Sequence, residues 1–408
     1  MKTTAIKQLR EKILASTEHC VACGLCLPWC PTYQLSNVEF ESPRGRIALL
    51  QGLANSKLTP HASTTELLNH CLLCRSCEKH CPSKVSFGEA MDAGRQLMQR
   101  PTSLGGELSR KLSDYALRYP EWLRRLLLPA VVLGKIVPPS LTRKAGNSRI
   151  FKLLSYLPSL QLHSRWDSTL QAKTPRRGCV DLFLGCAARS MDAKTIDNSI
   201  SLLNLQGFDV HIPSEQSCCG AISLHSGRNT SAVSLMNNNL AAFSNSPASS
   251  IIHMSTGCGI TLAEYARHVD DRDDISERIN EICTFLDKHW QDVTPIVHAN
   301  KHVLLHMPCS ADGSIAPERL LKRIPGLQLS HMKNTHGCCG SAGTYMLSHP
   351  EVAAELRAPL IEQVSQLRPD VVATTNPGCA LHLAEGLRNL EIDIPVVHPV
   401  SILAAQVK

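Results

Sequence analysis

Aromatic residues and long hydrophobic runs are scarce in this sequence. Phe, Trp and Tyr make up 4% of its 408 residues, and no basic motif with interleaved aromatic residues is present, which argues against nucleic-acid binding. The longest apolar run, LLLPAVVLG at 126–134, contains a proline and is far shorter than the ~20 residues that span a bilayer. No Gly-x-Gly-x-x-Gly follows a strand and opens a helix, so we expect no dinucleotide site.

A secretion signal is also missing, whereas cysteine is abundant. The first residues, MKTTAIKQLREKIL, predict a polar amphipathic helix without an apolar signal core. Eighteen cysteines in such a chain indicate a reducing compartment and metal ligation, so we expect a cytoplasmic protein. With 43% hydrophobic residues, the chain is long enough for two or three domains.

One cysteine pattern occurs twice near the amino terminus. Each copy is CxxCxxCxxxC followed directly by proline, and the second copy begins 51 residues after the first. This spacing is typical of bacterial ferredoxins that bind 4Fe-4S clusters. The copies contain Cys20, Cys23, Cys26 and Cys30, and then Cys71, Cys74, Cys77 and Cys81.

In two-cluster ferredoxins the cysteine before the proline ligates the cluster of the other copy. The expected ligand sets are therefore Cys20, Cys23, Cys26 and Cys81 for one cluster, and Cys71, Cys74, Cys77 and Cys30 for the other. Structural zinc is the alternative, but a tetrahedral zinc site gives no reason for the third cysteine or the proline. A disulfide framework is less favoured in a long chain with clustered cysteines.

A longer pattern is duplicated after residue 178. Three apolar runs that reach cysteines, CVDLFLGC, GFDVHIPSEQSCCG and SSIIHMSTGCG, return in the same order as KHVLLHMPC, GLQLSHMKNTHGCCG and PDVVATTNPGC. The spans match, with 72 residues from Cys186 to Cys258 and 70 from Cys309 to Cys379. The duplication predicts two similar lobes.

Each apolar run predicts a buried parallel strand, followed by a loop that carries a cysteine. Since ligands collect beyond the carboxyl ends of such strands, each lobe would bring four thiols to one edge. Those candidate metal ligands are Cys186, Cys218, Cys219 and Cys258, and then Cys309, Cys338, Cys339 and Cys379. Buried structural cysteines are the alternative for these eight, and they are our expectation for Cys179 and Cys283, which the repeat does not contain.

The net charge of +7 is unevenly distributed, with +2 in 1–94, +12 in 95–177 and −7 in 178–408. We therefore expect a multidomain protein. A small, mainly helical dicluster domain (1–94) and a basic helical connector (95–177) would precede two α/β Cys-Cys-Gly domains (178–295 and 296–408). The connector is expected to pack as a helix with a solvated charged face; contact with a partner, or peripheral contact with an anionic inner-membrane surface on the cytoplasmic side, is the alternative.

As a whole, the chain resembles the iron-sulfur subunits of glycolate oxidase. The resemblance rests on the two ferredoxin-type motifs, the two Cys-Cys-Gly regions, SPRGRIALL between the motifs and HGCCGSAGTY in the second repeat. That family is related to the iron-sulfur subunits of D-lactate and anaerobic glycerol-3-phosphate dehydrogenases and to a subunit of heterodisulfide reductase. In the wider family each Cys-Cys-Gly domain closes with CxxC, but here Ser255 and Asn376 replace the first cysteine of that pair. A five-thiolate cluster is thus not expected, which leaves a cubane cluster, zinc or no metal.

The resemblance implies electron transfer within a larger complex. A partner flavoprotein with FAD would oxidise a 2-hydroxy acid such as glycolate or D-lactate, and the clusters would pass single electrons to an acceptor such as a quinone. No catalytic residue is assigned to this chain, because oxidation of the acid is expected on the partner. The alternatives are a heterodisulfide-reductase-like subunit that reduces a disulfide or quinone at its Cys-Cys-Gly lobes, and a metal-bound scaffold without a redox role.

Overall fold

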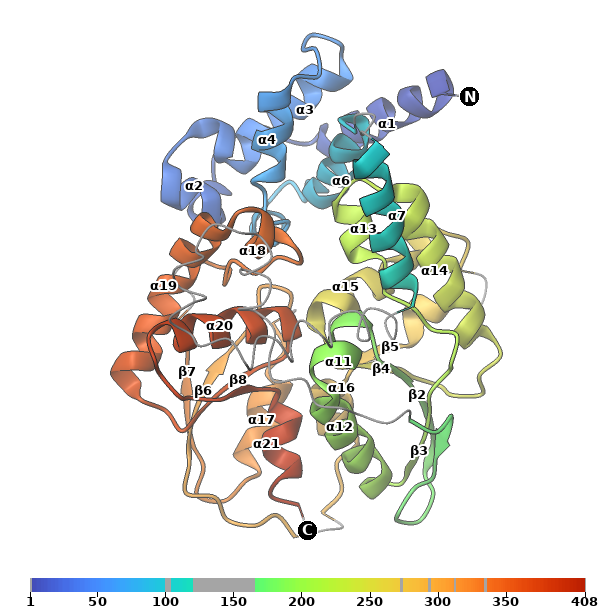
Figure 1. Ribbon diagram of the computed structural model, residues 1–408, viewed down its shortest axis with the longest axis vertical. Coiled ribbons are helices and arrows are strands. Elements are labelled where there is room, and N and C mark those ends of the chain that lie inside the picture. The colour runs from blue at the N-terminus through green and yellow to red at the C-terminus, as the bar shows by residue number, and fades with distance from the viewer. Residues whose placement is uncertain are drawn as a thin grey trace. The chain divides into compact units, whose positions relative to one another are not determined.

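The computed structural model describes residues 2–99, 104–119, 166–271, 274–292, 295–311, 313–333 and 336–407 (Figure 1). They form two compact units, a helical unit of Met1–Lys111, Ala221–Ala232 and Asn334–Leu356, and an α/β unit of Leu112–Gly220, Val233–Lys333 and Arg357–Lys408. Most of the basic connector, 120–165, lies outside the described residues. Among the helices that are described, none is long and apolar enough to cross a membrane.

The helical unit is built from short helices around the two ferredoxin-type motifs. Its elements are α1 (Lys2–Thr17), η1 (Leu27–Trp29), α2 (Pro31–Ser36), η2 (Glu39–Glu41), α3 (Pro43–Ala54), α4 (Ala62–Asn69), α5 (Ser76–Lys79), α6 (Phe87–Leu97), α13 (Ala221–His225) and α18 (Tyr345–Ser348). Three further helices have residues in both units: α7 (Leu104–Arg118), α14 (Asn229–Ser244) and α19 (Pro350–Leu367).

The core of the helical unit forms where α1 and α3 pack against α6, with Ile13, Leu50 and Met91 fully buried. The start of α3 is set by its own sequence. Ser42 caps the helix by accepting a hydrogen bond from Gly45 N at 2.9 Å, and Pro43 occupies the first turn. A side chain at Gly45 would collide with Glu39 O, because its Cβ would lie 2.0 Å from that oxygen. This packing fixes the segment between the two cysteine motifs.

The α/β unit contains two similar lobes, each with a largely parallel sheet. The first lobe comprises β1 (Thr169–Leu170), β2 (Gly178–Phe183), α11 (Cys186–Met191), α12 (Ala193–Leu205), β3 (Phe208–His211), β4 (Ile251–His253), α15 (Thr256–Ala263), η3 (Tyr265–Arg267), η4 (Ile275–Arg278), β5 (Ile279–Glu281) and α16 (Ile282–His289). The second comprises β6 (His302–His306), α17 (Ala316–Lys322), β7 (Gln328–His331), β8 (Val371–Thr374), α20 (Pro377–Asn389), β9 (Val396–Val397) and α21 (Pro399–Ala404).

The strand orders confirm the predicted duplication. The first sheet has the order β1-β3-β2-β4-β5 and the second β7-β6-β8-β9, so the two differ only by the antiparallel edge strand β1. All other pairs are parallel. The predicted fold class, a helical amino-terminal region followed by two lobes with parallel sheets, is therefore correct. In each lobe the second parallel strand lies on one side of the first, and the third lies on its other side. Such folds bind ligands at this point, between the first and third parallel strands.

A single hydrophobic core joins the two lobes. Helices α12 and α16 of the first lobe pack against α17 and α21 of the second, and Figure 1 shows these four helices between the sheets. Val180, Leu182 and Ile252 from the first sheet and Val303 and Leu305 from the second all contribute buried side chains. Because both lobes share this core, their strand ends are held in fixed positions within the α/β unit.

Sequence analysis missed the fourth parallel strand of each lobe. β5 (sequence INE) and β9 (sequence VV) are too short to show a strand pattern, and their residues are only partly buried. They form because neighbouring strands supply parallel partners, with His253 opposite Glu281 and Ala373 opposite Val397.

Asp181 on β2 supports the most buried ionic network of the first lobe. Its side chain is inaccessible to solvent, and it accepts hydrogen bonds from His211 Nδ1 at 2.8 Å, Ser246 Oγ at 2.7 Å and Arg278 at 3.3 Å. We predict that Asp181→Ala lowers the free energy of unfolding by up to about 3 kcal/mol, because it leaves the partly buried guanidinium of Arg278 and the Ser246 hydroxyl without their acceptor. Glu318→Ala removes a surface pair with Lys322 and should cost less than about 1 kcal/mol. Equal thermal midpoints for the two variants would contradict this prediction.

Candidate metal centres

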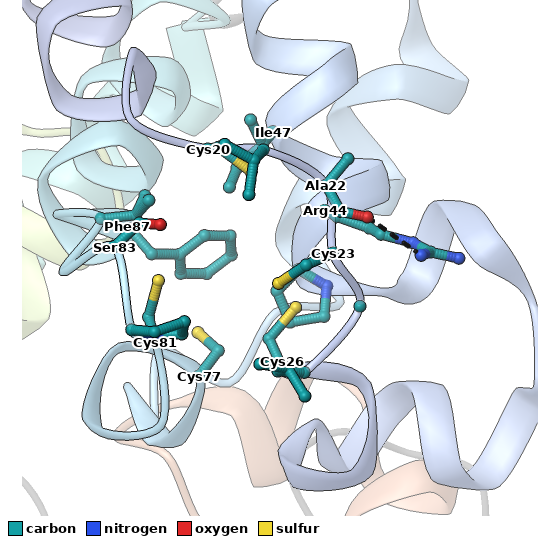
Figure 2. Close-up of a pocket in the computed structure, with 16 residues that line it drawn as sticks. Cys20, Ala22, Cys23, Cys26, Arg44, Ile47, Cys77, Cys81, Ser83 and Phe87 are labelled. Carbon is teal, nitrogen blue, oxygen red and sulfur yellow. Dashed lines mark hydrogen bonds between the residues drawn. The ribbon is translucent and has the colours of Figure 1, made fainter.

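The first cavity of the helical unit is lined by cysteines from both ferredoxin-type motifs. It encloses about 450 Å³ with its open mouth included. The thiols that line it are those of Cys20, Cys23, Cys26, Cys77 and Cys81. Figure 2 shows the sulfur atoms of Cys23, Cys26 and Cys81 pointing into the same space, although Cys81 belongs to the second motif. Of these five thiols, four are enough for a 4Fe-4S cluster, and Cys77 also lines a second cavity.

A second cavity, of about 310 Å³, adjoins the first through a shared cysteine. It is lined by Cys30 of the first motif and by Cys71, Cys74 and Cys77 of the second. The Cys30 thiol is held there by Thr32 Oγ1 at 3.4 Å and by the Glu41 carbonyl oxygen, which accepts its hydrogen bond at 3.5 Å. Each cavity thus receives the cysteine before proline from the opposite motif.

The two motif loops share an unusual backbone conformation. Ala22 and Gly24 have φ values of 51° and 84°, and the equivalent residues Leu73 and Arg75 have values of 50° and 57°. Left-handed conformations are unfavourable for Ala, Leu and Arg, and such strain concentrates at binding sites. Alternating conformations of this kind curl a loop around one centre with its N–H groups turned inward, a geometry that suits an anionic cluster.

Trp29 and His80 also occupy equivalent positions in the two motifs, and their rings stack on each other. The ring centroids are 3.5 Å apart and the planes are 8° from parallel. Because each residue directly precedes the last cysteine of its motif, this stack holds the two crossing cysteines, Cys30 and Cys81, beside the cavities of their partners' motifs. The helical unit therefore brings equivalent residues of the two copies into contact.

The electrostatic environment favours metal binding over thiol chemistry. Burial raises the pKa of Cys26, and burial together with the neighbouring thiols of Cys74 and Cys71 raises the pKa of Cys77 well above its ordinary value. Thiols that hold their protons so strongly are poor nucleophiles at neutral pH. A metal that displaces these protons would restore the thiolates and remove the conflict between them.

Each cavity borders an arginine from the SPRGR segment. Arg46 is buried beside the second cavity, where it pairs with Glu41 at 2.5 Å and lies 3.9 Å from the Cys30 sulfur. Glu41 in turn contacts His70 Nδ1 at 2.9 Å. Arg44 lines the first cavity and donates to the Ala22 carbonyl oxygen at 3.2 Å. Sequence analysis noted the segment but assigned no role to either arginine.

In the first lobe of the α/β unit, the four candidate cysteines converge at the predicted sheet edge. Cys186 begins α11 after β2, and Cys258 lies in the first turn of α15 after β4, so both sit in helices rather than in the expected loops. The Cys186 and Cys218 sulfurs are 3.5 Å apart. Hydrogen bonds to Cys218 and Cys258, together with burial, raise the pKa of Cys219 well above its ordinary value. Four thiols therefore meet where the strand order reverses.

A buried hydrogen-bond network holds the Cys-Cys loop of this lobe. Asn239 on α14 accepts from Ser217 N at 2.8 Å and donates to the Cys218 carbonyl oxygen at 2.9 Å. Tyr265 donates to the Cys219 carbonyl oxygen at 2.9 Å. These contacts are made by backbone groups of the loop, and they fix the positions from which the Cys218 and Cys219 side chains extend.

The residues that replace the missing fifth cysteine have structural roles. Asn376 caps α20 by accepting from Gly378 N at 2.9 Å, and it also donates to Ser310 Oγ at 3.3 Å. Ser255 is the residue before α15, the corresponding position in the first lobe. Both positions thus begin a helix, and Asn is among the preferred residues for such a cap.

The cysteines of the second lobe are divided between the two units. Cys309 and Cys379 belong to the α/β unit, with Cys379 in the first turn of α20 after β8. Cys338 and Cys339 belong to the helical unit, within Asn334–Leu356. Of the two cysteines outside the repeat, Cys179 is partly exposed on β2 and Cys283 is fully buried in α16.

Comparison with protein families defines the class to which these features belong. The model for a 4Fe-4S dicluster domain matches 16–85, and the model for a cysteine-rich domain matches twice, at 180–263 and 303–384. This is an iron-sulfur protein with a dicluster ferredoxin-type region and two cysteine-rich domains, and the dicluster domain implies two 4Fe-4S clusters.

The chain belongs to the family of glycolate oxidase iron-sulfur subunits. It is 31% identical to a probable glycolate oxidase iron-sulfur subunit of Bacillus subtilis over 94% of this chain and 93% of the relative. It is also 31% identical to the glycolate oxidase iron-sulfur subunit of Escherichia coli, over 95% and 96% of the two chains. A crystal structure of a hypothetical protein from Helicobacter pylori shares the fold, with a TM-score of 0.56 at 10% identity over 91% of this chain and 68% of the other.

The buried network around the Cys-Cys loop gives a testable prediction. Asn239→Ala should lower the free energy of unfolding by about 1–3 kcal/mol for each buried backbone group left without a partner. In metal-free protein, it should also speed alkylation of Cys218 and Cys219, measured by mass spectrometry. Asn238→Ala is the matched control, because the neighbouring Asn238 makes only exposed contacts, such as its hydrogen bond to Glu215 O. Alkylation at the same rate in both variants would contradict the assigned role of Asn239.

Proposed function

We propose that this chain is the electron-transfer subunit of a flavin-dependent 2-hydroxy-acid dehydrogenase complex of the glycolate oxidase type. A partner flavoprotein would oxidise glycolate or D-lactate, and this chain would pass the electrons to an acceptor such as a quinone. The observation that carries the proposal is the pair of thiol-lined cavities that share Cys77, because two adjoining clusters form a path for single electrons. Membership of the glycolate oxidase iron-sulfur subunit family supports the choice of complex.

We assign the cluster ligands by the cavity that each thiol lines and, for Cys77, which lines both cavities, by its place in the second ferredoxin-type motif. One set is Cys20, Cys23, Cys26 and Cys81, and the other is Cys30, Cys71, Cys74 and Cys77. Such clusters accept and release one electron at a time, whereas a flavin gives up two, so two clusters in series match the partner's chemistry. Arg44 and Arg46 would stabilise the added negative charge of the reduced clusters.

The exposed side of the first cavity is the proposed place of electron exchange with a partner. Cys23 is exposed, and Val21 and Leu25 beside it are 73% and 57% exposed. Three of the four thiols assigned to the second cavity are buried. A partner that covers Val21 and Leu25 would bring its cofactor to the more accessible cluster, and the apolar contact would exclude water from the path.

The first Cys-Cys-Gly lobe is proposed to hold a metal rather than to reduce a substrate. Cys186, Cys218 and Cys219 are buried, with Cys218 fully inaccessible, so a disulfide or quinone could not reach these thiols without opening the lobe. Four thiolates suit a cubane cluster or a zinc ion. These burial values favour the electron-transfer proposal over the heterodisulfide-reductase-like alternative.

The proposed function predicts both the metal content and the partner. The chain purified anaerobically should contain about eight irons attributable to residues 20–81, with two magnetically interacting 4Fe-4S clusters in the electron paramagnetic resonance spectrum after reduction. When the chain is tagged and expressed with its neighbouring genes, an FAD-containing protein should copurify. Stoichiometric zinc without iron after anaerobic reconstitution would contradict the cluster assignment. Copurification without any flavoprotein would contradict the proposed complex.

Reciprocal serine variants test the crossing of the ligands. Cys30→Ser should disturb the cluster held by Cys71, Cys74 and Cys77 and leave the other cluster intact, because Cys30 lines the second cavity. Cys81→Ser should have the opposite effect, which makes each variant the control for the other. Redox titrations followed by electron paramagnetic resonance would identify the cluster that changes. If each variant lost the cluster of its own motif, the crossed assignment would be wrong.

A further inference from the structure

The fourth strands of the two lobes end at a cluster of buried and partly buried polar side chains. Glu281 ends β5 and caps α16, and His398 follows β9 and caps α21. These are corresponding positions of the duplicated fold, because β5 pairs with β4 as β9 pairs with β8. Helices α16 and α21 contact each other within the shared core, so the two caps approach from opposite lobes.

Three different donor atoms meet at this point. A carboxylate oxygen of Glu281, a ring nitrogen of His398 and the sulfur of Cys283 all lie within 4.8 Å of one another. Cys283 is inaccessible to solvent and His398 is 4% exposed. Carboxylate, thiolate and imidazole are the three ligand types that zinc binds in proteins, and a modest contraction would bring them to bonding distance.

Some polar atoms of this cluster have only weak partners. Within the described part of the chain, Glu281 Oε1 and His398 Nε2 are buried and make no well-aligned hydrogen bond. The same holds for Nδ1 of His253, which lies opposite Glu281 on β4. The Glu281 carboxylate interacts with Cys283, and the His398 ring interacts with the Met254 backbone. Buried polar atoms are rarely left without a partner, because removing them from water is costly. Several weakly paired polar atoms at one place are compatible with a bound cation.

We propose that Glu281, Cys283 and His398 bind a zinc ion that joins the two lobes. The ion would take Glu281 Oε1, the Cys283 sulfur and His398 Nε2, and its fourth position would be filled by a water molecule or by His253. The two anionic ligands balance the charge of Zn²⁺, so the buried site is neutral when loaded. Binding releases the Cys283 thiol proton to solvent, and no electron is transferred.

The contacts of Glu281 with Thr284 fit that arrangement, whereas the contact of His398 with Val400 would have to change. Glu281 uses its other oxygen, Oε2, to accept from Thr284 N at 2.9 Å and Thr284 Oγ1 at 3.3 Å, which orients the carboxylate and leaves Oε1 for the metal. His398 Nδ1 accepts from Val400 N at 3.3 Å. Metal binding at Nε2 would place the ring proton on Nδ1, so this long contact would be given up in exchange for the metal bond.

This site differs from the Cys-Cys-Gly centres in its ligands and in its role. It contains one cysteine that the repeat does not share, and it links a helix of one lobe to a helix of the other. Its ligands follow β5 and β9, the strands that sequence analysis missed. The proposal therefore stands whether or not the chain transfers electrons in a glycolate oxidase complex.

The test measures zinc in the full chain and in matched variants. Each protein is equilibrated with Zn²⁺, freed of excess metal by gel filtration, and analysed for zinc and iron by mass spectrometry. Cys283→Ser should contain one zinc equivalent fewer than the wild type, while Cys179→Ser, which changes a cysteine of the same lobe outside both proposed kinds of site, should lose none. Zinc X-ray absorption spectra should show a site with a single sulfur ligand at about 2.3 Å that is absent in Cys283→Ser.

A second variant distinguishes the loss of a zinc ligand from a folding defect. Glu281→Gln keeps the size of the side chain and its contact with Thr284, and should lose the same zinc equivalent while its circular dichroism spectrum stays unchanged. A zinc chelator should lower the thermal midpoint of the wild type and of Cys179→Ser by more than that of Glu281→Gln, which keeps only the Cys-Cys-Gly sites. Equal zinc in all four proteins, zinc found only in sites with four sulfurs, or a wild type that binds no zinc would each overturn the proposal, and the last result would assign the cluster to a buried water.

Discussion

The parallel pairing of strands in the two sheets is the constraint on which the rest of the α/β unit depends. Parallel strands place all their carboxyl ends at one edge, so each residue that follows a strand reaches that edge. Cys186, Cys258, Glu281, Cys379 and His398 all leave the sheets in this way. The hydrophobic core that joins α12 and α16 to α17 and α21 keeps the two edges in register with each other. Ligands far apart in sequence are thereby brought together by backbone geometry, before any metal contributes.

The helical unit brings its cysteines together without a sheet. Its ferredoxin-type motifs bring thiols together through local backbone conformation, with left-handed residues at Ala22 and Leu73 that ordinary side chains seldom adopt. That conformation is unfavourable for the free chain, so it must be stabilised by contacts such as the Trp29–His80 stack and, when bound, by the clusters. Metal content and folding are therefore coupled more tightly in this unit, whereas the core of the α/β unit can form from its apolar strands and helices.

Much of this arrangement could be predicted from the sequence, because the informative patterns are local. The doubled cysteine motif indicated the two clusters, and the repeated order of apolar runs gave the duplication and the parallel sheets. Three features could not be predicted. The strands β5 and β9 lack any pattern of their own and exist only through their neighbours. From the sequence alone, Arg46 is expected at the surface, whereas the fold buries it in an ion pair with Glu41. Cys283 has no counterpart in the repeat, and only the fold places it beside Glu281 and His398.

The duplication also explains how one backbone can support different chemistry in its two halves. Corresponding positions keep their structural task, since Glu281 and His398 both cap a helix and Ser255 and Asn376 both precede one. The chemical identity of such positions can therefore differ between the lobes. A carboxylate in one lobe and an imidazole in the other provide one anionic and one neutral ligand for a cation. The same divergence separates the cysteine sites. The four thiols of the first lobe lie within one unit, whereas Cys338 and Cys339 of the second belong with the ferredoxin-type region. Substitution of Cys338 or Cys339 would thus act within the unit that contains the ferredoxin-type motifs, whereas substitution of Cys186 or Cys258 would act within the α/β unit.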